Sequence, residues 1–401
     1  MAEPVVVVAG ALANKPANGG EAWVRLSWIR GLQRLGCRVF FVEEIDEAVC
    51  TDAQRRPAPF ATSANRAWFD DVTRSFGLAG RSGLLYHGRR GGDAAADGEI
   101  AGEGLSRAAL TEIAGGADLL VNISGHLADP GLLGAFRRKA YVDIDPGFTQ
   151  FWHTTGNGGA RLDGHDRYFT IGEGIGTAAC TVPGAGFEWI PVRPPVVLED
   201  WPASQPVAAL GEPRRFTTVA TWRGPYGPVE TDRRRFGLKV HEFRRFIGVA
   251  GLVPATFEAA LAIHPDEVPD LDLLHDHGWR LTDPVSVAGT PAAFGDYVRS
   301  SDAEFSAAQG MYVETNSGWF SDRTTRYLAS GRPALVQDTG FSARLPTGKG
   351  LVAFSTLDEA VDGARSILAD YTVHAAAARA VAESCFDSDT VLARFLEQCG
   401  L

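Results

Sequence analysis

Pro4-Val5-Val6-Val7-Val8-Ala9-Gly10 is a short run of β-branched side chains that ends in small residues. A glycine-rich turn follows at 16–20, and apolar side chains then recur at helical spacing until Gly36. Residues 37–42 form a second apolar run. A strand, a helix and a strand in this order predict a βαβ unit, and therefore a parallel sheet with helices on both faces.

The same alternation continues along the chain. The further strands expected in the first half are 83–86, 119–123, 140–144 and 168–171. The stretch from Ile190 to Pro202 carries four prolines and no periodicity, which is typical of a stiff connection between domains. We therefore expect a first domain at residues 1–195.

The second half repeats this architecture. Its expected strands are 215–220, 257–263, 311–314 and 334–336, with a helix at 240–249. Three alanine- and leucine-rich helices are expected at 357–368, 371–383 and 388–398. The sequence thus predicts a second α/β domain at 196–375 and C-terminal helices at 376–401, the last of which crosses back to the first domain.

Composition narrows the classes of function. The chain has 401 residues, and 38 Lys and Arg against 49 Asp and Glu give a net charge of −11. Such a protein repels nucleic acid and anionic membranes, so we expect neither as a partner. No apolar run is long enough to span a membrane and no secretion signal is evident, which favours a cytoplasmic monomer or homodimer. The five cysteines include no CxxC pair, so neither a redox nor a metal role is expected.

The most informative stretch runs from Glu314 to Phe341. Ser317 and Gly318 open a turn, and Ser321 is a candidate helix N-cap. Three further residues, Asp322, Arg323 and Thr324, fall in the first helical turn. Free amide groups, hydroxyls and a guanidinium in this arrangement suit a diphosphate.

The segment Tyr327-Leu328-Ala329-Ser330-Gly331-Arg332-Pro333-Ala334-Leu335-Val336-Gln337-Asp338 resembles the donor-site helix and strand of GT-B nucleotide-sugar glycosyltransferases, in a divergent bacterial branch. The resemblance implies two Rossmann-like domains facing across a cleft. Many retaining members carry two glutamates around this site, and here Gly318 and Arg326 stand at those positions. The resemblance also implies a nucleoside-diphosphate sugar as co-substrate, with no other cofactor required.

Other basic and glycine residues are candidates for the donor site. Arg223 follows the first strand of the second domain, where the resemblance implies a basic contact to the donor diphosphate. Lys239 precedes the next helix and either adds to this contact or is a surface cation. Gly19 and Gly20 lack the spacing of a dinucleotide loop, and they either approach the donor or form a plain turn.

Candidate catalytic residues lie in the first domain. His126 follows a strand and is either a general base or a structural histidine. Asp143 and Asp145 end the next strand and are candidates to orient or deprotonate an acceptor. The same Asp-x-Asp pattern can hold a metal, but so short a pattern arises easily by chance, and we expect no metal. The polar and aromatic residues expected to line an acceptor pocket are Phe148, Gln150, Trp152 and His153.

These residues favour a metal-independent glycosyltransferase that moves a sugar from a UDP-, GDP- or dTDP-sugar to a small molecule, a type of enzyme found in bacterial specialised metabolism. Two alternatives remain open. One is a sugar-nucleotide epimerase on the same scaffold, which needs no separate acceptor. The other is a cytosolic nucleotide or sugar sensor that closes on its ligand without reaction.

Overall fold

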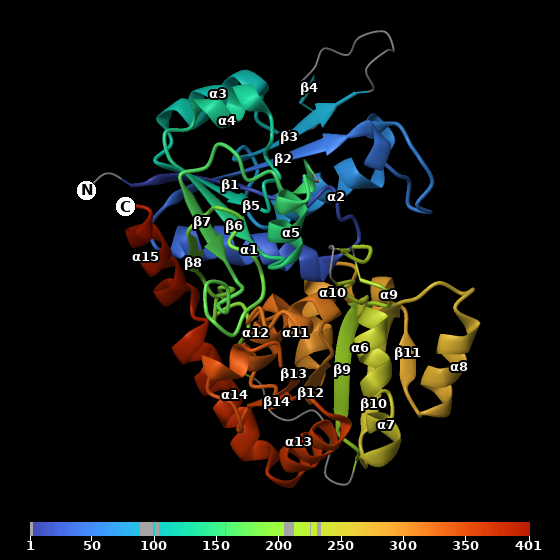
Figure 1. Ribbon diagram of the computed structural model, residues 1–401. Coiled ribbons are helices and arrows are strands. Elements are labelled where there is room, and N and C mark those ends of the chain that lie inside the picture. The colour runs from blue at the N-terminus through green and yellow to red at the C-terminus, as the bar shows by residue number, and fades with distance from the viewer. Residues whose placement is uncertain are drawn as a thin grey trace.

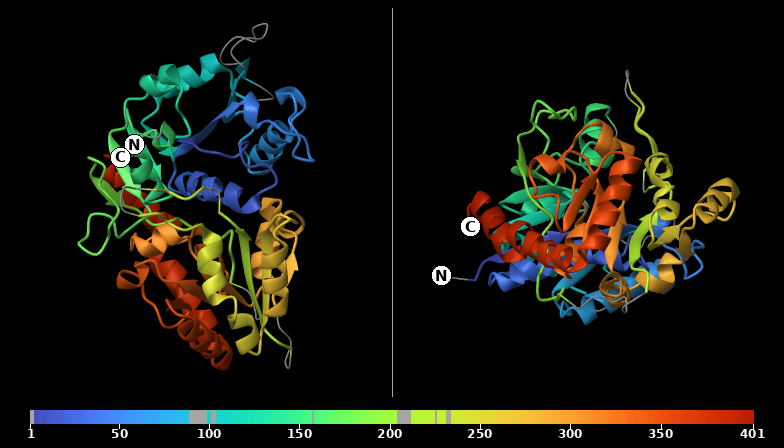
Figure 2. Two further views of the ribbon diagram at one scale, coloured as in Figure 1. Left: turned by 45° about the vertical axis from the view of Figure 1, so that its right-hand side comes forward. Right: turned by 90° about the horizontal axis from the view of Figure 1, so that it is seen from below.

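The computed structural model describes residues 3–88, 99–100, 104–156, 158–203, 212–224, 226–230 and 234–401. Two parallel-sheet domains lie one above the other (Figures 1 and 2). Within these described ranges, no helix is long and apolar enough to cross a membrane.

The first sheet lies in the upper domain of Figure 1 and has the strand order β4-β3-β2-β1-β5-β6-β7-β8. All its neighbouring strands are parallel except β3 and β4. Its strands are β1 (Val5–Ala9), β2 (Arg38–Asp46), β3 (Ser82–His87), β4 (Glu99–Ile100), β5 (Leu119–Ile123), β6 (Lys139–Asp143), β7 (Arg167–Thr170) and β8 (Trp189–Pro191). Its helices are α1 (Gly19–Arg34), α2 (Ala64–Ser75), α3 (Arg107–Gly116), α4 (Pro130–Ala135) and α5 (Phe148–Thr154).

The second sheet is parallel throughout and has the order β11-β10-β9-β12-β13-β14. Its strands are β9 (Arg215–Thr221), β10 (Thr256–Ala262), β11 (Arg280–Thr282), β12 (Ala303–Ser306), β13 (Ala334–Gln337) and β14 (Leu351–Phe354). The helices among and after them are α6 (Lys239–Phe246), α7 (Val249–Leu252), α8 (Val268–Asp276), α9 (Pro284–Ala288), α10 (Pro291–Arg299), α11 (Gly310–Glu314), α12 (Asp322–Ala329), α13 (Leu357–Ala369), α14 (Tyr371–Cys385) and α15 (Ser388–Gln398).

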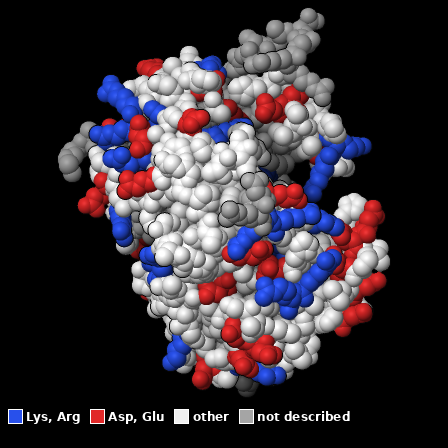
Figure 3. Space-filling view, viewed as in Figure 1, with Lys and Arg blue, Asp and Glu red and all other residues white. Residues whose placement is uncertain are grey.

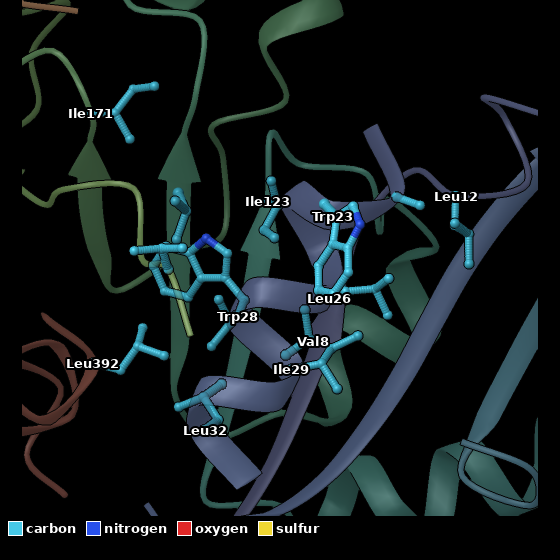
Figure 4. Close-up of a cluster of buried hydrophobic side chains, with 14 of the residues drawn as sticks. Val8, Leu12, Trp23, Leu26, Trp28, Ile29, Leu32, Ile123, Ile171 and Leu392 are labelled. Atoms are coloured by element: carbon cyan, nitrogen blue, oxygen red, sulfur yellow. The ribbon is translucent and has the colours of Figure 1, made fainter. Parts of the chain in front are cut away.

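The largest hydrophobic core is continuous between the two domains. One face of α1 packs on the first sheet through side chains such as Trp28 and Leu32, as Figure 4 shows. The same cluster includes Phe294 of α10 and Leu328 of α12 in the second domain. Burial of apolar surface, the main stabilising term in folding, therefore also joins the domains.

The C-terminal helices return to the first domain, as predicted. The aromatic rings of Trp28 in α1 and Phe395 in α15 lie 5.1 Å apart, edge to face. Val196 forms an isolated parallel bridge with Asp387, just before α15. In Figure 1 the red helices α14 and α15 run along one side of the molecule from the lower to the upper domain.

One expected strand is wrong. Residues Met311 to Glu314 lie in helix α11, and the strand of this region is β12 at Ala303–Ser306. A segment as short as Met-Tyr-Val-Glu does not distinguish helix from strand by periodicity, and here helix α11 begins four residues after the end of β12. The domain limits 1–195, 196–375 and 376–401 stay predictions. The last strand of the first sheet ends at Pro191 and the limit at 375 falls within α14.

Candidate functional site

Asp143 ends β6 and its carboxylate is completely buried. It accepts hydrogen bonds from the hydroxyls of Thr149 at 2.7 Å and Thr170 at 2.8 Å, and from Nε2 of Gln150 at 2.9 Å. Burial raises the pKa of Asp143 despite these hydrogen bonds. This carboxylate therefore organises the loop after β6, and Gln150, expected in an acceptor pocket, serves the same network.

Asp145 lies two residues further and faces the second domain. Its carboxylate accepts hydrogen bonds from the hydroxyls of Tyr226 and Tyr312, each at 2.9 Å. Burial and the negative charge of Asp143 raise the pKa of Asp145 to about 6. A carboxyl group that titrates near neutrality at a domain junction has the properties of a proton acceptor or donor.

Aromatic rings surround this junction. Phe148 begins α5 and lies with its ring 4.9 Å from that of Tyr226 and 5.8 Å from that of Tyr312. The ring of Trp152 lies 4.8 Å from that of Tyr226, whereas His153 packs on Phe187 at 5.2 Å. Phe148 and Trp152 therefore belong to the junction, and His153 belongs to a separate aromatic group in the first domain.

His126 follows β5 and is half-buried. Burial and the positive charges of Arg25, Arg161 and Lys15 lower the pKa of His126 to about 3. The imidazole is therefore neutral at pH 7 and is able to accept a proton, although it is a weak base.

Lys239 and Arg323 are two cations of the second domain, and the charge of Arg323 acts on Lys239. Lys239 is the first residue of α6, and Arg323 lies in the first turn of α12. Burial and the positive charge of Arg323 lower the pKa of Lys239 to about 7. Within the described part of the chain, the Lys239 ammonium group has no hydrogen bond or ion pair. A buried amine in this state gains its charge when an anion binds beside it.

Arg323 is already engaged inside the protein. Its guanidinium donates hydrogen bonds to Glu304 Oε1 at 2.6 Å, to the Val219 carbonyl at 2.7 Å and to Ser306 Oγ at 2.8 Å. Glu304 is completely buried, and its second oxygen, Oε2, has no partner among the described residues. The Arg323 guanidinium is therefore held in a fixed position. It supplies positive charge to the site, but the N–H groups named here already donate to the protein.

The other predicted donor residues lie in three settings. Arg223 is exposed and forms a salt bridge of 2.5 Å with Glu267. Asp322 pairs with Arg326 one helical turn later. Ser321 is the buried N-cap residue of α12, and the buried Thr324 hydroxyl has no partner in the described structure.

Ser317 and Gly318 lie against the first domain. The amide of Gly174 donates a hydrogen bond of 2.9 Å to the carbonyl of Ser317, and Gly172 and Trp319 form an isolated antiparallel bridge. A Cβ atom on Gly318 would lie 2.5 Å from the amide nitrogen of Gly174, and φ of Gly318 is +72°. Glycine is therefore required here for close contact between the domains.

Gly19 and Gly20 lie at a second contact between the domains. A Cβ atom on Gly19 would lie 2.0 Å from the carbonyl oxygen of Thr290, and one on Gly20 would lie 3.3 Å from the ring of Phe294. The indole of Trp23 donates a hydrogen bond of 2.9 Å to the Pro291 carbonyl. These glycines allow α1 to begin directly against α10.

Sequence reasoning missed three residues of the site, Tyr226, Tyr312 and Glu304. Tyr226 lies in a loop without periodicity, Tyr312 in the segment expected to be a strand, and Glu304 in β12, a buried strand that was not among those expected. No local sequence pattern identifies these three residues, because the residues that they contact are distant in the sequence.

Among the described residues, no group of three or more His, Cys, Asp and Glu side chains is placed to hold a metal ion. Figure 3 shows that the surface is indented on its right side between the domains, where Lys and Arg side chains border it.

No family model matches the chain, and no curated protein matches its sequence significantly. Solved structures do match over its whole length. HepE from Anabaena in complex with UDP-glucose has a TM-score of 0.58 at 13% identity, covering 99% of both chains. Sucrose-phosphate synthase from Thermosynechococcus elongatus has a TM-score of 0.54 at 12% identity, covering 99% of this chain and 98% of that one.

AviGT4, a glycosyltransferase involved in avilamycin A biosynthesis, has a TM-score of 0.53 at 14% identity, covering 99% of this chain and 97% of that one. At these identities the likeness concerns the fold. It agrees with the two parallel sheets and the returning C-terminal helices. The chain therefore has the GT-B fold, which these glycosyltransferases share.

Proposed function

We propose that this protein is a glycosyltransferase that moves a sugar from a nucleoside-diphosphate sugar to a small-molecule acceptor. The observation that carries the proposal is the Lys239 and Arg323 pair at the starts of α6 and α12, where Lys239 has no anionic partner among the described residues. Helix N-termini and the unpaired Lys239 favour the diphosphate of a donor and of the leaving nucleotide.

The fold supports the same donor class. One of the matching structures, HepE, is a complex with UDP-glucose. We infer that Lys239 contacts the diphosphate directly and that Arg323 adds a fixed charge beside it. Arg223, Ser321, Asp322 and Thr324 are proposed as further donor-site residues, together with the Ser317–Gly318 turn and the glycines Gly19 and Gly20.

The first domain is proposed to hold the acceptor. Asp145 lies at the junction with the second domain, and its raised pKa suits a group that exchanges a proton with the acceptor. His126 is the second candidate base, and Asp143 positions the loop after β6 through Thr149 and Gln150. Phe148, Trp152 and His153 are proposed to line the acceptor side.

A calorimetric titration with UDP, GDP and dTDP, each with and without EDTA, tests the donor site. We expect one nucleotide to bind in both buffers, since charged side chains are proposed to replace a metal. Lys239→Gln should weaken binding of that nucleotide about tenfold, the usual cost of a charged hydrogen bond. Lys349→Gln, an exposed lysine of the same domain, is the matched control and should bind as the wild type does.

The reaction itself separates the alternatives. Incubation with UDP-glucose and an acceptor mixture should release UDP and form a glycoside, detected by chromatography and mass spectrometry. An epimerase would convert the sugar nucleotide without release of UDP, and a sensor would leave it intact. Equal nucleotide affinity of the wild type and Lys239→Gln would overturn the donor site proposed here.

A further inference from the structure

The side chain of Tyr226, in the loop after β9 of the second domain, lies among residues of the first domain. Its hydroxyl donates a hydrogen bond of 2.9 Å to one carboxylate oxygen of Asp145. Its ring lies 4.9 Å from the tilted ring of Phe148 and 4.8 Å from the ring of Trp152, which it meets edge to face. We call Asp145, Phe148 and Trp152, the three residues that contact the Tyr226 phenol, the phenol cage.

The phenol cage is held in shape without Tyr226. Phe148 and Trp152 lie four residues apart on one face of α5, and their rings lie 5.7 Å from each other. The second carboxylate oxygen of Asp145 accepts a hydrogen bond of 2.9 Å from Tyr312, which is only 2% exposed. An aromatic wall and a hydrogen-bond acceptor are therefore positioned independently of Tyr226.

The contacts of the cage fit both ends of a phenol. Aromatic rings prefer tilted and edge-to-face neighbours at about 4.5–7 Å, and both ring contacts of Tyr226 are of these kinds. A carboxylate oxygen accepts the hydroxyl proton. The negative charge of Asp145 raises the pKa of Tyr226, so this hydroxyl is protonated when it donates. The occupant that fits the cage is therefore a neutral aromatic ring with a hydroxyl group.

Tyr226 is held less firmly than the cage. It is half-buried, and the next residue, Gly227, is exposed, with no atom within 4 Å of an ideal Cβ. Among the described residues, neither of these two forms a backbone hydrogen bond. Two residues earlier, Gly224 has φ +87°, a conformation that glycine adopts at little cost. The Tyr226 side chain is therefore able to leave the cage through a local change in this stretch.

The rest of the same loop is anchored. Val229 and Phe236 are 7% and 2% exposed, and the amide of Phe236 donates a hydrogen bond of 3.0 Å to the carbonyl of Val229. The ring of Phe236 lies 5.2 Å from that of Phe151 in α5. Departure of Tyr226 thus keeps the contact between the loop and α5 and frees one oxygen of Asp145.

We propose that the phenol cage is the acceptor subsite and that the acceptor is a phenol, which displaces Tyr226 and takes over its contacts. The hydroxyl of the acceptor then donates to Asp145, the candidate base, and its ring packs on Phe148 and Trp152. The role as acceptor rests on the glycosyl transfer proposed above, whereas binding of a phenol to the cage does not.

The reaction on such an acceptor is balanced. The phenol oxygen forms a bond to the anomeric carbon of the donor while the bond from that carbon to the diphosphate oxygen breaks. The electron pair of the broken bond leaves with the nucleoside diphosphate. The phenol proton passes to Asp145 and from there to solvent. The products are an aryl glycoside and a nucleoside diphosphate.

A fluorine NMR titration with 4-fluorophenol tests the cage, because the fluorine signal reports weak binding directly. The wild type should bind 4-fluorophenol. It should bind 4-fluoroanisole, which has no hydroxyl to donate, about tenfold more weakly. Cyclohexanol, which has a hydroxyl but no aromatic ring, should not displace 4-fluorophenol.

Substitutions of Tyr226 give a graded result. Tyr226→Ala should bind 4-fluorophenol about tenfold more tightly than the wild type, because the ligand no longer has to displace a side chain. Tyr226→Phe keeps the ring but loses the hydrogen bond to Asp145, so its affinity should lie between the two. The matched control is Tyr168→Phe, another half-buried tyrosine, whose hydroxyl donates to the Leu162 carbonyl at 3.0 Å. It should bind as the wild type does, and melting temperatures check that all three variants fold.

The outcomes separate this proposal from the proposed transfer. Absence of 4-fluorophenol binding to the wild type, equal affinity in the wild type and both Tyr226 variants, or equal affinity for 4-fluoroanisole overturns the phenol cage. If the affinities follow the expected order but no aryl glycoside forms with UDP-, GDP- or dTDP-glucose, the phenol cage stands and the proposed glycosyl transfer fails. If the protein glycosylates an aliphatic alcohol and binds no phenol, the transfer stands and the phenol cage is wrong.

Discussion

Asp145 of the first domain accepts a hydrogen bond of 2.9 Å from the hydroxyl of Tyr312, which lies in α11 of the second domain. The other carboxylate oxygen accepts a hydrogen bond from Tyr226, also of the second domain. One carboxylate therefore joins a loop of the first sheet to two elements of the second.

Tyr312→Phe should destabilise the protein by about 1–3 kcal/mol, because it removes a hydrogen bond to a carboxylate and leaves the buried ring in place. The ring keeps its stacking on Trp319, whose centroid lies 4.4 Å away. Urea unfolding measures the difference. The same substitution in an Asp145→Asn background should cost clearly less, and equal costs in both backgrounds would show that the two residues are not coupled.

The pKa of Asp145, raised to about 6, predicts a pH dependence. The folded state holds this proton up to about pH 6, whereas the unfolded state loses it near pH 4. The contribution of Asp145 to the free energy of unfolding is therefore fully present below pH 4 and is lost as the pH rises through 6. Relative to Asp145→Asn, the wild type should lose on the order of 1 kcal/mol between pH 4.5 and 7.5. Parallel stability profiles of the two proteins would contradict the raised pKa.

Gly19→Ala should force α1 and α10 apart, because the new Cβ atom would meet the Thr290 carbonyl at 2.0 Å. We expect a loss of about 1–3 kcal/mol in the free energy of unfolding. The control is Gly115→Ala in α3, where no atom lies within 4 Å of the added Cβ. That variant should be as stable as the wild type or slightly more so. A Gly19→Ala protein of normal stability with weakened nucleotide binding would instead support a donor contact.

Arg323→Met should destabilise the second domain by about 3–5 kcal/mol, because it leaves the fully buried Glu304 without its partner. The double variant Arg323→Met with Glu304→Gln removes both charges and should regain most of this loss. Thermal unfolding compares the three proteins. If the single variant is as stable as the wild type, Arg323 is free to serve the donor alone.

Local patterns were sufficient for most of the fold. The β-branched run at 5–9, the helix that follows it and the three C-terminal helices all have periodicity that depends on neighbouring residues only. The short segment at Met311 to Glu314 lacked this information, because four residues fit a helix as well as a strand. Because this segment is helix α11, Tyr312 lies at the domain junction and not in a sheet.

The sequence by itself determined that two parallel α/β domains form and that residues 322–324 begin a helix, because hydrophobic periodicity and capping are local properties. Only the tertiary structure decided which side chains meet. Asp145 accepts hydrogen bonds from tyrosines 81 and 167 residues away. Gly19 allows helix α1 to lie against the Thr290 carbonyl, at the start of α10. The charges around Lys239 and around His126 likewise come from separate elements. Such distances and burial arise from the packing of distant segments, and packing also sets the pKa values.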